Sequence, residues 1–150
     1  MIHHGLAILK EFGSWFTCLE ELYLLADTYR KAKKISEGLA TVEEALAMVH
    51  ENGFRLQEPG LYRLKGMLLL LGGEANSEAE VCFRRAIEVA RRLKAKTWEL
   101  RATMSLCRLW QMQGQRERAR KMLGEIYAWF TEGFETRDLK EAKALLEVLS

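Results

Sequence analysis

The sequence predicts an all-α protein, built as a right-handed solenoid of helix pairs, and three observations support this prediction. Apolar residues recur three or four positions apart through most of the 150 residues, which is the spacing of one helix face. Pro59 is the only proline, so long helices are favoured. Ala45, Ala86 and Ile126 hold equivalent places at steps of 41 and 40 residues, a period typical of stacked helix pairs.

The first helix pair is expected over residues 14–53. The apolar stripe of its first helix is Trp15, Leu19, Leu22, Ala26 and Tyr29, and that of its second helix is Leu39, Val42, Ala45 and Val49. Gly53 follows the second stripe, where glycine is favoured because it adopts the left-handed conformation that ends a helix. Gly13 lies 40 residues before Gly53, so residues 1–13 are expected to be the end of the second helix of an earlier pair. We therefore expect the chain to be a piece of a longer protein.

The second pair is expected over residues 54–94. Its stripes are Leu61, Leu64, Leu68 and Leu71 in the first helix, and Ala79, Phe83, Ala86, Ala90 and Leu93 in the second. Gly72 and Gly73 close the first of these helices. Ser77 and Glu80 have the spacing of a capping box, in which two side chains satisfy free backbone N–H groups at a helix start. The Pro59-Gly60 dipeptide leaves undetermined the residue at which the first helix of this pair begins.

The third pair is expected over residues 95–134, and a single capping helix over 135–150. The stripes are Leu100, Thr103, Leu106 and Trp110 before Gly114, then Ala119, Leu123, Ile126 and Phe130, then Leu139, Ala142, Leu146 and Leu149. Asp138 and Glu141 have capping-box spacing at the start of the last helix. No helix follows it, so we expect it to cover the last apolar face. The aromatics Trp98, Trp110, Trp129 and Phe130 are expected mainly in the core.

The residue types within each pair match those of a tetratricopeptide repeat. In that repeat a small residue and an aromatic residue on the first helix meet small and large apolar residues on the second, so the two helices approach closely. The corresponding sets are Ala26, Tyr29, Gly38, Val42 and Ala45, then Gly66, Leu69, Ala79, Phe83 and Ala86, then Cys107, Trp110, Gly114, Ala119, Leu123 and Ile126. The period exceeds the usual 34 residues by about six, so helices about one turn longer are expected.

Four strings resemble a more specific group of proteins. They are LYRLKG at 61–66, CFRRAIEVAR at 82–91, WELRATMSLCRLW at 98–110 and WFTEGFETRDLKEAKALL at 129–146. They are similar to the C-terminal tetratricopeptide tails of large bacterial signalling proteins, and the resemblance covers about residues 14–149. In that family a class III adenylate or guanylate cyclase domain, a P-loop regulatory ATPase domain, or both, precede the repeats. The resemblance implies a regulatory or sensor arm without catalytic parts.

Composition and motifs disfavour several other functions. The formal charge is +2, and the basic stretches at 84–96 and 116–121 are interleaved with glutamates, so nucleic-acid binding is not favoured. The apolar run 67–71 is too short to span a membrane. Cys18, Cys82 and Cys107 form no CxxC pair and are expected to be buried thiols in the cytoplasm. The spacing of His3, His4 and His50 indicates no metal site, and no phosphate loop or nucleophile–base pair is present. We expect no cofactor and no enzyme activity.

The concave face is the expected binding surface, because the first helix of each pair lines the groove in repeats of this kind. Its exposed positions are predicted to be Tyr23, Asp27, Arg30, Arg63, Met67, Leu70, Arg101, Met104, Arg108 and Gln111. Arg63, Arg101 and Arg108 together could hold a carboxylate through forked hydrogen bonds. Met67 and Met104 would add adaptable apolar contact. The alternative is that these side chains are solvated or packed against neighbouring repeats.

The leading functional hypothesis is a non-catalytic scaffold that binds a protein or peptide segment, with an acidic segment as one candidate. The lysine and asparagine pattern of clamps for chaperone tails is absent from the predicted groove. One alternative is self-association into a homodimer, in which the N-terminal helix end, whose apolar side chains Leu6, Leu9 and Phe12 need cover, or the C-terminal helix swaps or stacks with another copy. Another alternative is a sensor that binds a small effector in the groove.

Overall fold

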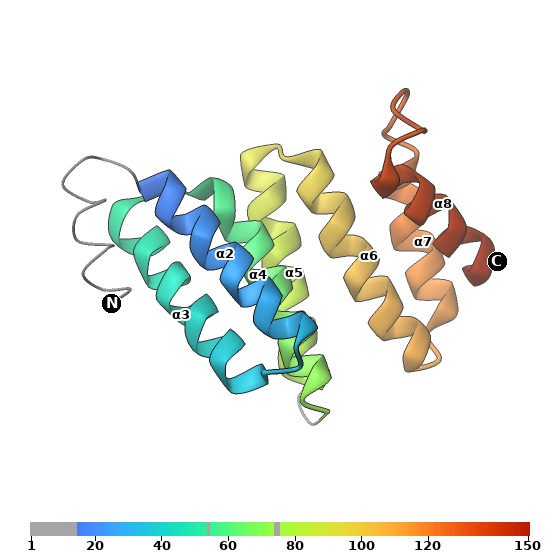
Figure 1. Ribbon diagram of the computed structural model, residues 1–150. Helices are drawn as coiled ribbons and strands as arrows, with labels where there is room; N and C mark the ends of the chain where they lie inside the picture. The colour runs from blue at the N-terminus through green and yellow to red at the C-terminus, as the bar shows by residue number, and fades with distance from the viewer. Residues whose placement is uncertain (1–14, 54, 74–75) are drawn as a thin grey trace.

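The computed structural model describes residues 15–53, 55–73 and 76–150, and these residues are all-α, which confirms the all-α part of the expected fold class (Figure 1). They contain no strand. The helices are α2 (Trp15–Lys31), α3 (Ile35–Asn52), α4 (Glu58–Leu71), α5 (Asn76–Leu93), α6 (Lys96–Met112), α7 (Arg116–Tyr127) and α8 (Arg137–Leu149), with a 3₁₀ turn, η1 (Arg55–Gln57), before α4. Within these ranges, no helix combines the length and the apolar character needed to cross a lipid bilayer.

Each helix packs against the next one along the chain, and a second set of contacts links alternate helices. Helix α4 contacts α2, α6 contacts α4, and α8 contacts α6. The four even-numbered helices therefore form a continuous row, which can be followed in Figure 1. This row is the surface on which the candidate site lies.

Glycines end three helices where the sequence predicts an end. Gly53, Gly73 and Gly114 have φ angles of 77°, 82° and 78°, in the left-handed region that favours glycine. The backbone N–H of Gly53 donates to the Val49 carbonyl at 2.8 Å, which satisfies a carbonyl at the end of α3. Lys33 and Lys94 adopt the same region without being glycines, in the turns between α2 and α3 and between α5 and α6.

Two other glycines allow helices to approach closely. A Cβ atom at Gly66 would lie 2.5 Å from Cε1 of Phe83, which is fully buried on α5. A Cβ atom at Gly38 would lie 2.8 Å from Cδ2 of Leu68 on α4. Both distances are shorter than any normal carbon contact, so only glycine fits these helix crossings without a shift. Small residues therefore set the helix spacing in these two places.

The apolar core consists of two clusters. The first joins α2, α3 and α4, and its buried residues are Cys18, Leu19, Leu22, Ala26, Val42, Ala45, Leu46, Met48, Val49, Leu61, Leu64 and Leu68. The second joins α5 to α8 and includes Phe83, Leu100, Leu106, Trp110, Leu123, Leu139 and Leu149. Tyr62 of α4 packs against both clusters. Most of the predicted stripe residues lie in these clusters, because one face of each helix is buried.

The two predicted capping boxes are wrong. Ser77 lies inside α5, which begins at Asn76, and the Glu80 carboxylate instead accepts hydrogen bonds from Arg84 and Trp110. Thr136 caps α8 by accepting a hydrogen bond from the Leu139 N–H at 3.5 Å. The Asp138 carboxylate is held by Arg101. In both places, the carboxylate that the motif assigns to the helix start pairs with an arginine instead. For Glu80 the arginine is on the same helix, and for Asp138 it is on a neighbouring helix.

The end of the sixth expected helix also differs from the prediction. Helix α7 stops at Tyr127, so Phe130 lies in the loop that leads to α8. Trp129 is 57% exposed, against the expectation of a core position, and its ring stacks edge-on with Phe130 at 5.1 Å between centroids. Leu71, at the end of α4, is 44% exposed as well. Helical periodicity fails at these residues because the helix ends before or at them.

Some expectations fall outside the described residues. These are the helix end over residues 1–13, the apolar side chains of Leu6, Leu9 and Phe12, the histidines His3 and His4, and the side chain of Trp15. The limits of the expected repeat units, at residues 14–53, 54–94, 95–134 and 135–150, stay predictions.

Candidate functional site

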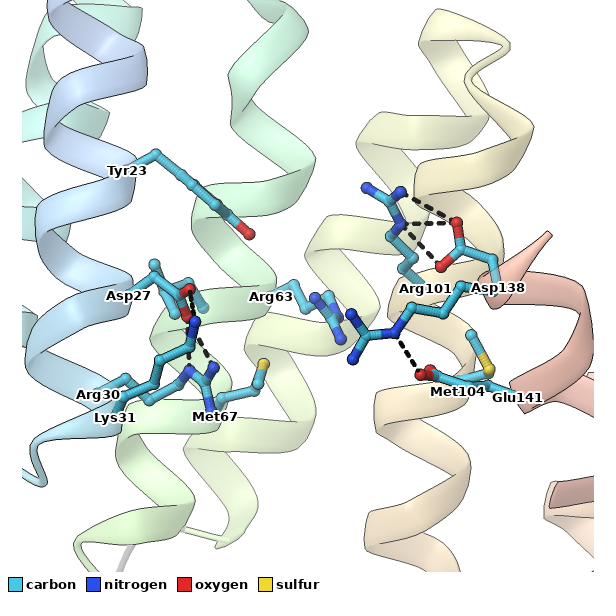
Figure 2. Close-up of a pocket in the computed structure, with 12 residues that line it drawn as sticks. Tyr23, Asp27, Arg30, Lys31, Arg63, Met67, Arg101, Met104, Asp138 and Glu141 are labelled. Carbon is cyan, nitrogen blue, oxygen red and sulfur yellow. Dashed lines mark hydrogen bonds and ion pairs between the residues drawn. The ribbon is translucent and has the colours of Figure 1, made fainter. Parts of the chain in front are cut away.

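The row of even-numbered helices is hollowed into a pocket of about 290 Å³, here called the groove (Figure 2). Its lining residues come from all four helices: Tyr23, Asp27, Arg30 and Lys31 from α2, Arg63, Leu64 and Met67 from α4, Arg101 and Met104 from α6, and Arg137, Asp138 and Glu141 from α8. The groove is therefore built from segments that lie more than 100 residues apart in the sequence.

Seven of the ten residues predicted for the concave face line the groove. They are Tyr23, Asp27, Arg30, Arg63, Met67, Arg101 and Met104. Leu70, Arg108 and Gln111 do not line it. Leu70 packs against the second core cluster, and the Arg108 side chain is 45% exposed beside Glu141. The helical register thus places residues of α2, α4 and α6 together, and the three excluded residues lie nearer the C-terminal ends of α4 and α6.

One end of the groove is closed by an ion-pair cluster on α2. Arg30 Nε donates to Asp27 Oδ1 at 2.8 Å, and Lys31 Nζ lies 3.3 Å from the other carboxylate oxygen. Burial alone would raise the pKa of Asp27, but the hydrogen bonds and charges of Arg30 and Lys31 outweigh it and hold the pKa below its usual range. Asp27 is therefore ionised at neutral pH and neutralises part of the basic charge of α2.

The other end is closed by α8. Arg101 holds Asp138 in a forked arrangement, with Nε and Nη2 donating to the carboxylate at 3.0 to 3.1 Å. Arg137 Nε donates to Glu141 Oε1 at 2.9 Å, and Arg108 Nη2 lies 3.9 Å from the other oxygen of Glu141. In this structure α8 supplies carboxylates to both Arg101 and Arg108, and the expectation that they join Arg63 in holding a ligand carboxylate stays a prediction.

Arg63 lies between these two ends, and its surroundings differ. Its Nε donates to the Ser105 hydroxyl at 2.9 Å, and that hydroxyl donates to the Arg101 carbonyl at 3.2 Å. Within the part of the chain that the structure describes, no carboxylate pairs with Arg63. Burial lowers the pKa of Arg63, and the charges of Arg101, Arg108 and Arg30 lower it further, against an opposing effect of Tyr23. The guanidinium is thus a cation in a positive and partly dry environment.

Tyr23 and Trp98 support the groove beside Arg63. Their rings pack edge-on with 6.2 Å between centroids, and Arg101 Cζ lies 4.8 Å from the Trp98 ring centroid. A Cβ atom at Gly60 would lie 2.7 Å from Trp98 Cη2 and 3.1 Å from Tyr23 Cε2, so the glycine after Pro59 makes room for both rings. Burial raises the pKa of Tyr23, which keeps the phenol neutral and able to donate a hydrogen bond. Figure 2 shows its hydroxyl directed into the opening that Arg63 also enters.

The groove has a net positive charge and an apolar floor. Five cationic side chains and three carboxylates line it, which leaves a net charge of +2. Between the charged ends, Met67 is half-buried and supplies apolar surface, while Leu64 and Met104 are almost fully buried beneath it. Sequence reasoning missed the contribution of α8, since Asp138 and Glu141 were assigned to a capping box. Their spacing three apart on one helix face was the available signal.

Outside the groove, a second pocket of about 250 Å³ is lined by Arg84, Ile87, Glu88, Arg91, Arg92 and Met122. Cys18, Cys82 and Cys107 are buried free thiols, as expected. Burial raises the pKa of Cys107 to about 12, and its Sγ donates to the Ala119 carbonyl at 3.2 Å. No group of three or more histidine, cysteine or acidic side chains is placed to hold a metal ion among the residues described. In the basic stretches, Arg84 pairs with Glu80, and Arg92 pairs with Glu88.

The fold and groove define an all-α protein with an open groove of net positive charge along one row of helices. No family model matches the chain, and no curated protein matches it. Among solved structures, the crystal structure of BtubC (BKLC) from P. vanneervenii is similar to it, with a TM-score of 0.72 and 20% sequence identity. The match covers 88% of this chain and 55% of the BtubC chain, so this chain spans about half the length of that protein. At this identity, the likeness shows the fold alone.

Proposed function

We propose that this chain is a non-catalytic helical-repeat scaffold of tetratricopeptide-like pairs, which binds an acidic peptide or protein segment in the groove. The contacts between alternate helices, α2 with α4, α4 with α6 and α6 with α8, support a repeated arrangement, because a stacked array brings equivalent helices together. The period of 41 and 40 residues in the sequence supports the same reading.

The observation that carries this proposal is the charge of Arg63. A partly buried guanidinium without a carboxylate partner is costly, and an anion from a bound segment would relieve that cost. The net charge of +2 around it would attract an acidic segment during approach. The thioethers of Met67 and Met104 would adapt to different apolar side chains beside the acid.

The strings at 61–66, 82–91, 98–110 and 129–146 extend the proposal to biological context. By their resemblance, the scaffold would be the C-terminal regulatory or sensor arm of a bacterial signalling ATPase or nucleotide cyclase in the cytoplasm. Binding in the groove would then change the activity of a domain outside this chain. The test of this context is whether occupancy of the groove alters nucleotide turnover by the longer protein.

Binding in the groove can be tested by selecting from a random peptide library displayed on phage, with the purified chain as bait. We expect enrichment of sequences that contain Asp or Glu beside apolar residues, and loss of this enrichment with Arg63→Glu. Arg92→Glu is the matched control, since it makes the same charge change on α5, outside the groove. Circular dichroism melting of each variant verifies folding, and Arg63→Gln provides a milder change. Absence of enrichment, or an equal loss with the control, would overturn the proposed function.

A further inference from the structure

We propose that the groove recognises a single carboxylate side chain of the bound segment, seated on Arg63 and flanked by apolar residues, and not a run of acidic residues. This inference rests on the proposed function and specifies the chemistry of its ligand. It differs from the sequence-based hypothesis, in which three arginines share the binding of acidic groups.

The charge distribution along the groove limits the number of anions that it can bind. Asp27 neutralises the α2 end, where Arg30 and Lys31 both contact its carboxylate. Asp138 occupies the fork of Arg101, and Glu141 accepts from Arg137. A second or third ligand carboxylate would meet these protein carboxylates and be repelled by them. Arg63 is therefore the one cationic group of the groove, among the residues described, that has no carboxylate partner.

The hydrogen bonds of Arg63 leave one edge of its guanidinium available. Nε is used by the Ser105 hydroxyl, and Ser105 is itself fixed by its bond to the Arg101 carbonyl. No hydrogen bond from Nη1 or Nη2 to a described residue is present, so these two nitrogens can donate to both oxygens of one carboxylate. The Tyr23 hydroxyl, directed into the same opening, is a further neutral donor.

The size and floor of the groove fit one acidic side chain with apolar neighbours. About 290 Å³ is at the lower end of the roughly 300–1,000 Å³ of ligand pockets, which is room for one anchoring group. Leu64 and Met104 are buried beneath the opening, and Met67 is half-buried beside it. Since Leu64 and Met104 are only 2% and 1% exposed, the apolar surface open to a ligand is that of Met67. An apolar residue beside the acid would cover Met67, and a string of acids would leave it exposed to water.

The test uses three blocked pentapeptides, Ala-Leu-Glu-Leu-Ala, Ala-Leu-Gln-Leu-Ala and Ala-Glu-Glu-Glu-Ala, titrated into the isotopically labelled chain. Chemical shifts of the arginine Nε–H groups and of the Ser105 amide report binding at this position. We expect the single-Glu peptide to bind about tenfold or more tightly than its Gln counterpart, since a charge-assisted pair is lost. We expect Arg63→Gln to remove that difference and Arg92→Gln to keep it.

Each outcome separates this inference from the proposed function. If the triple-Glu peptide binds about tenfold more tightly than the single-Glu peptide, or if Arg63→Gln keeps the preference for Glu over Gln, the single-carboxylate site is wrong and peptide binding stands. If none of the three peptides shifts any groove signal and the phage selection is also empty, the proposed function itself fails. If a free acid such as glutarate shifts Arg63 as strongly as the peptide does, the ligand is a small molecule, which overturns the assignment to a peptide side chain.

Discussion

Arg101 of α6 and Asp138 of α8 are joined by three hydrogen bonds of 3.0 to 3.1 Å between the guanidinium and the carboxylate. The two residues lie 37 positions apart, and their pairing makes α8 a wall of the groove. Helix α8 also covers the core with Leu139, Ala142, Leu145 and Leu149. Helix α8 therefore has two roles: it covers the apolar core and it forms a wall of the groove. The sequence indicates only the first role.

The pairing predicts that Asp138→Asn increases affinity for an acidic peptide. Asparagine leaves Arg101 without its carboxylate, so the groove gains one positive charge. We expect the dissociation constant of the single-Glu peptide to fall about threefold to tenfold, and the free energy of unfolding to fall by about 1 kcal/mol. Titration and urea denaturation measure the two effects. Glu132→Gln, which removes a charge in the α7–α8 loop, should change neither, and unchanged affinity in Asp138→Asn would contradict the prediction.

The helix crossing at Gly66 predicts that a single methyl group destabilises the fold. Alanine at 66 would place Cβ 2.5 Å from the buried Phe83 ring, so Gly66→Ala should lower the free energy of unfolding by about 1–3 kcal/mol. Gly124→Ala on α7 is the matched control, because nothing lies within 4 Å of its Cβ position. There the better helix propensity of alanine should raise stability by about 0.5–1 kcal/mol. Urea denaturation measures both, and equal effects of the two variants would refute this explanation of the crossing.

The start of α8 predicts a difference between two hydroxyl residues. Thr136 accepts the Leu139 N–H, so Thr136→Ala should cost about 0.5–2 kcal/mol of unfolding free energy. Ser77 lies inside α5, so Ser77→Ala should change stability by less than about 0.5 kcal/mol. Thermal and urea denaturation of both variants test this. A larger loss for Ser77→Ala than for Thr136→Ala would restore the capping box predicted from sequence.

The surroundings of Glu80 predict that the free energy of unfolding depends on pH in the acid range. Burial acts to raise the pKa of Glu80, but hydrogen bonds from Arg84 and Trp110 and the charges of Arg84 and Arg118 hold it below its usual 4.5. A lowered folded-state pKa contributes stability above the unfolded-state value, and this contribution is lost as the pH falls through the folded-state value. Glu80→Gln should therefore be about 1 kcal/mol less stable than the wild type at pH 7 and equally stable once Glu80 is protonated. Denaturation at several pH values measures the difference, and a constant gap down to pH 2 would exclude this cause.

The helices and part of the groove follow from the sequence because local rules govern them. Helical periodicity places Leu19, Phe83 and Leu123 in the core, and helical register brings Tyr23, Arg63 and Arg101 to one surface. The roles of Asp138 and Glu80 do not follow, since a carboxylate near a helix start can bond its own backbone or a cation on another helix. That choice depends on the position of Arg101 or Trp110 in space. Trp129 was misplaced for a related reason, because periodicity does not mark the residue at which α7 stops.

The division of the core into two clusters has a consequence for cooperativity. Helix α4 packs against both clusters, with Leu61, Leu64 and Leu68 in the first and Met67, Leu69 and Leu70 against the second, so α2 and α3 are the unit that can open with a lower free energy than the remaining helices. The groove takes α2 from one side of this division and α4, α6 and α8 from the other. An occupant that touches both sides would therefore couple the two units, and amide exchange in α2 and α3 would slow when the groove is filled. Occupancy would then be communicated to the N-terminal side of the chain as a change in its rate of opening, without a change of shape.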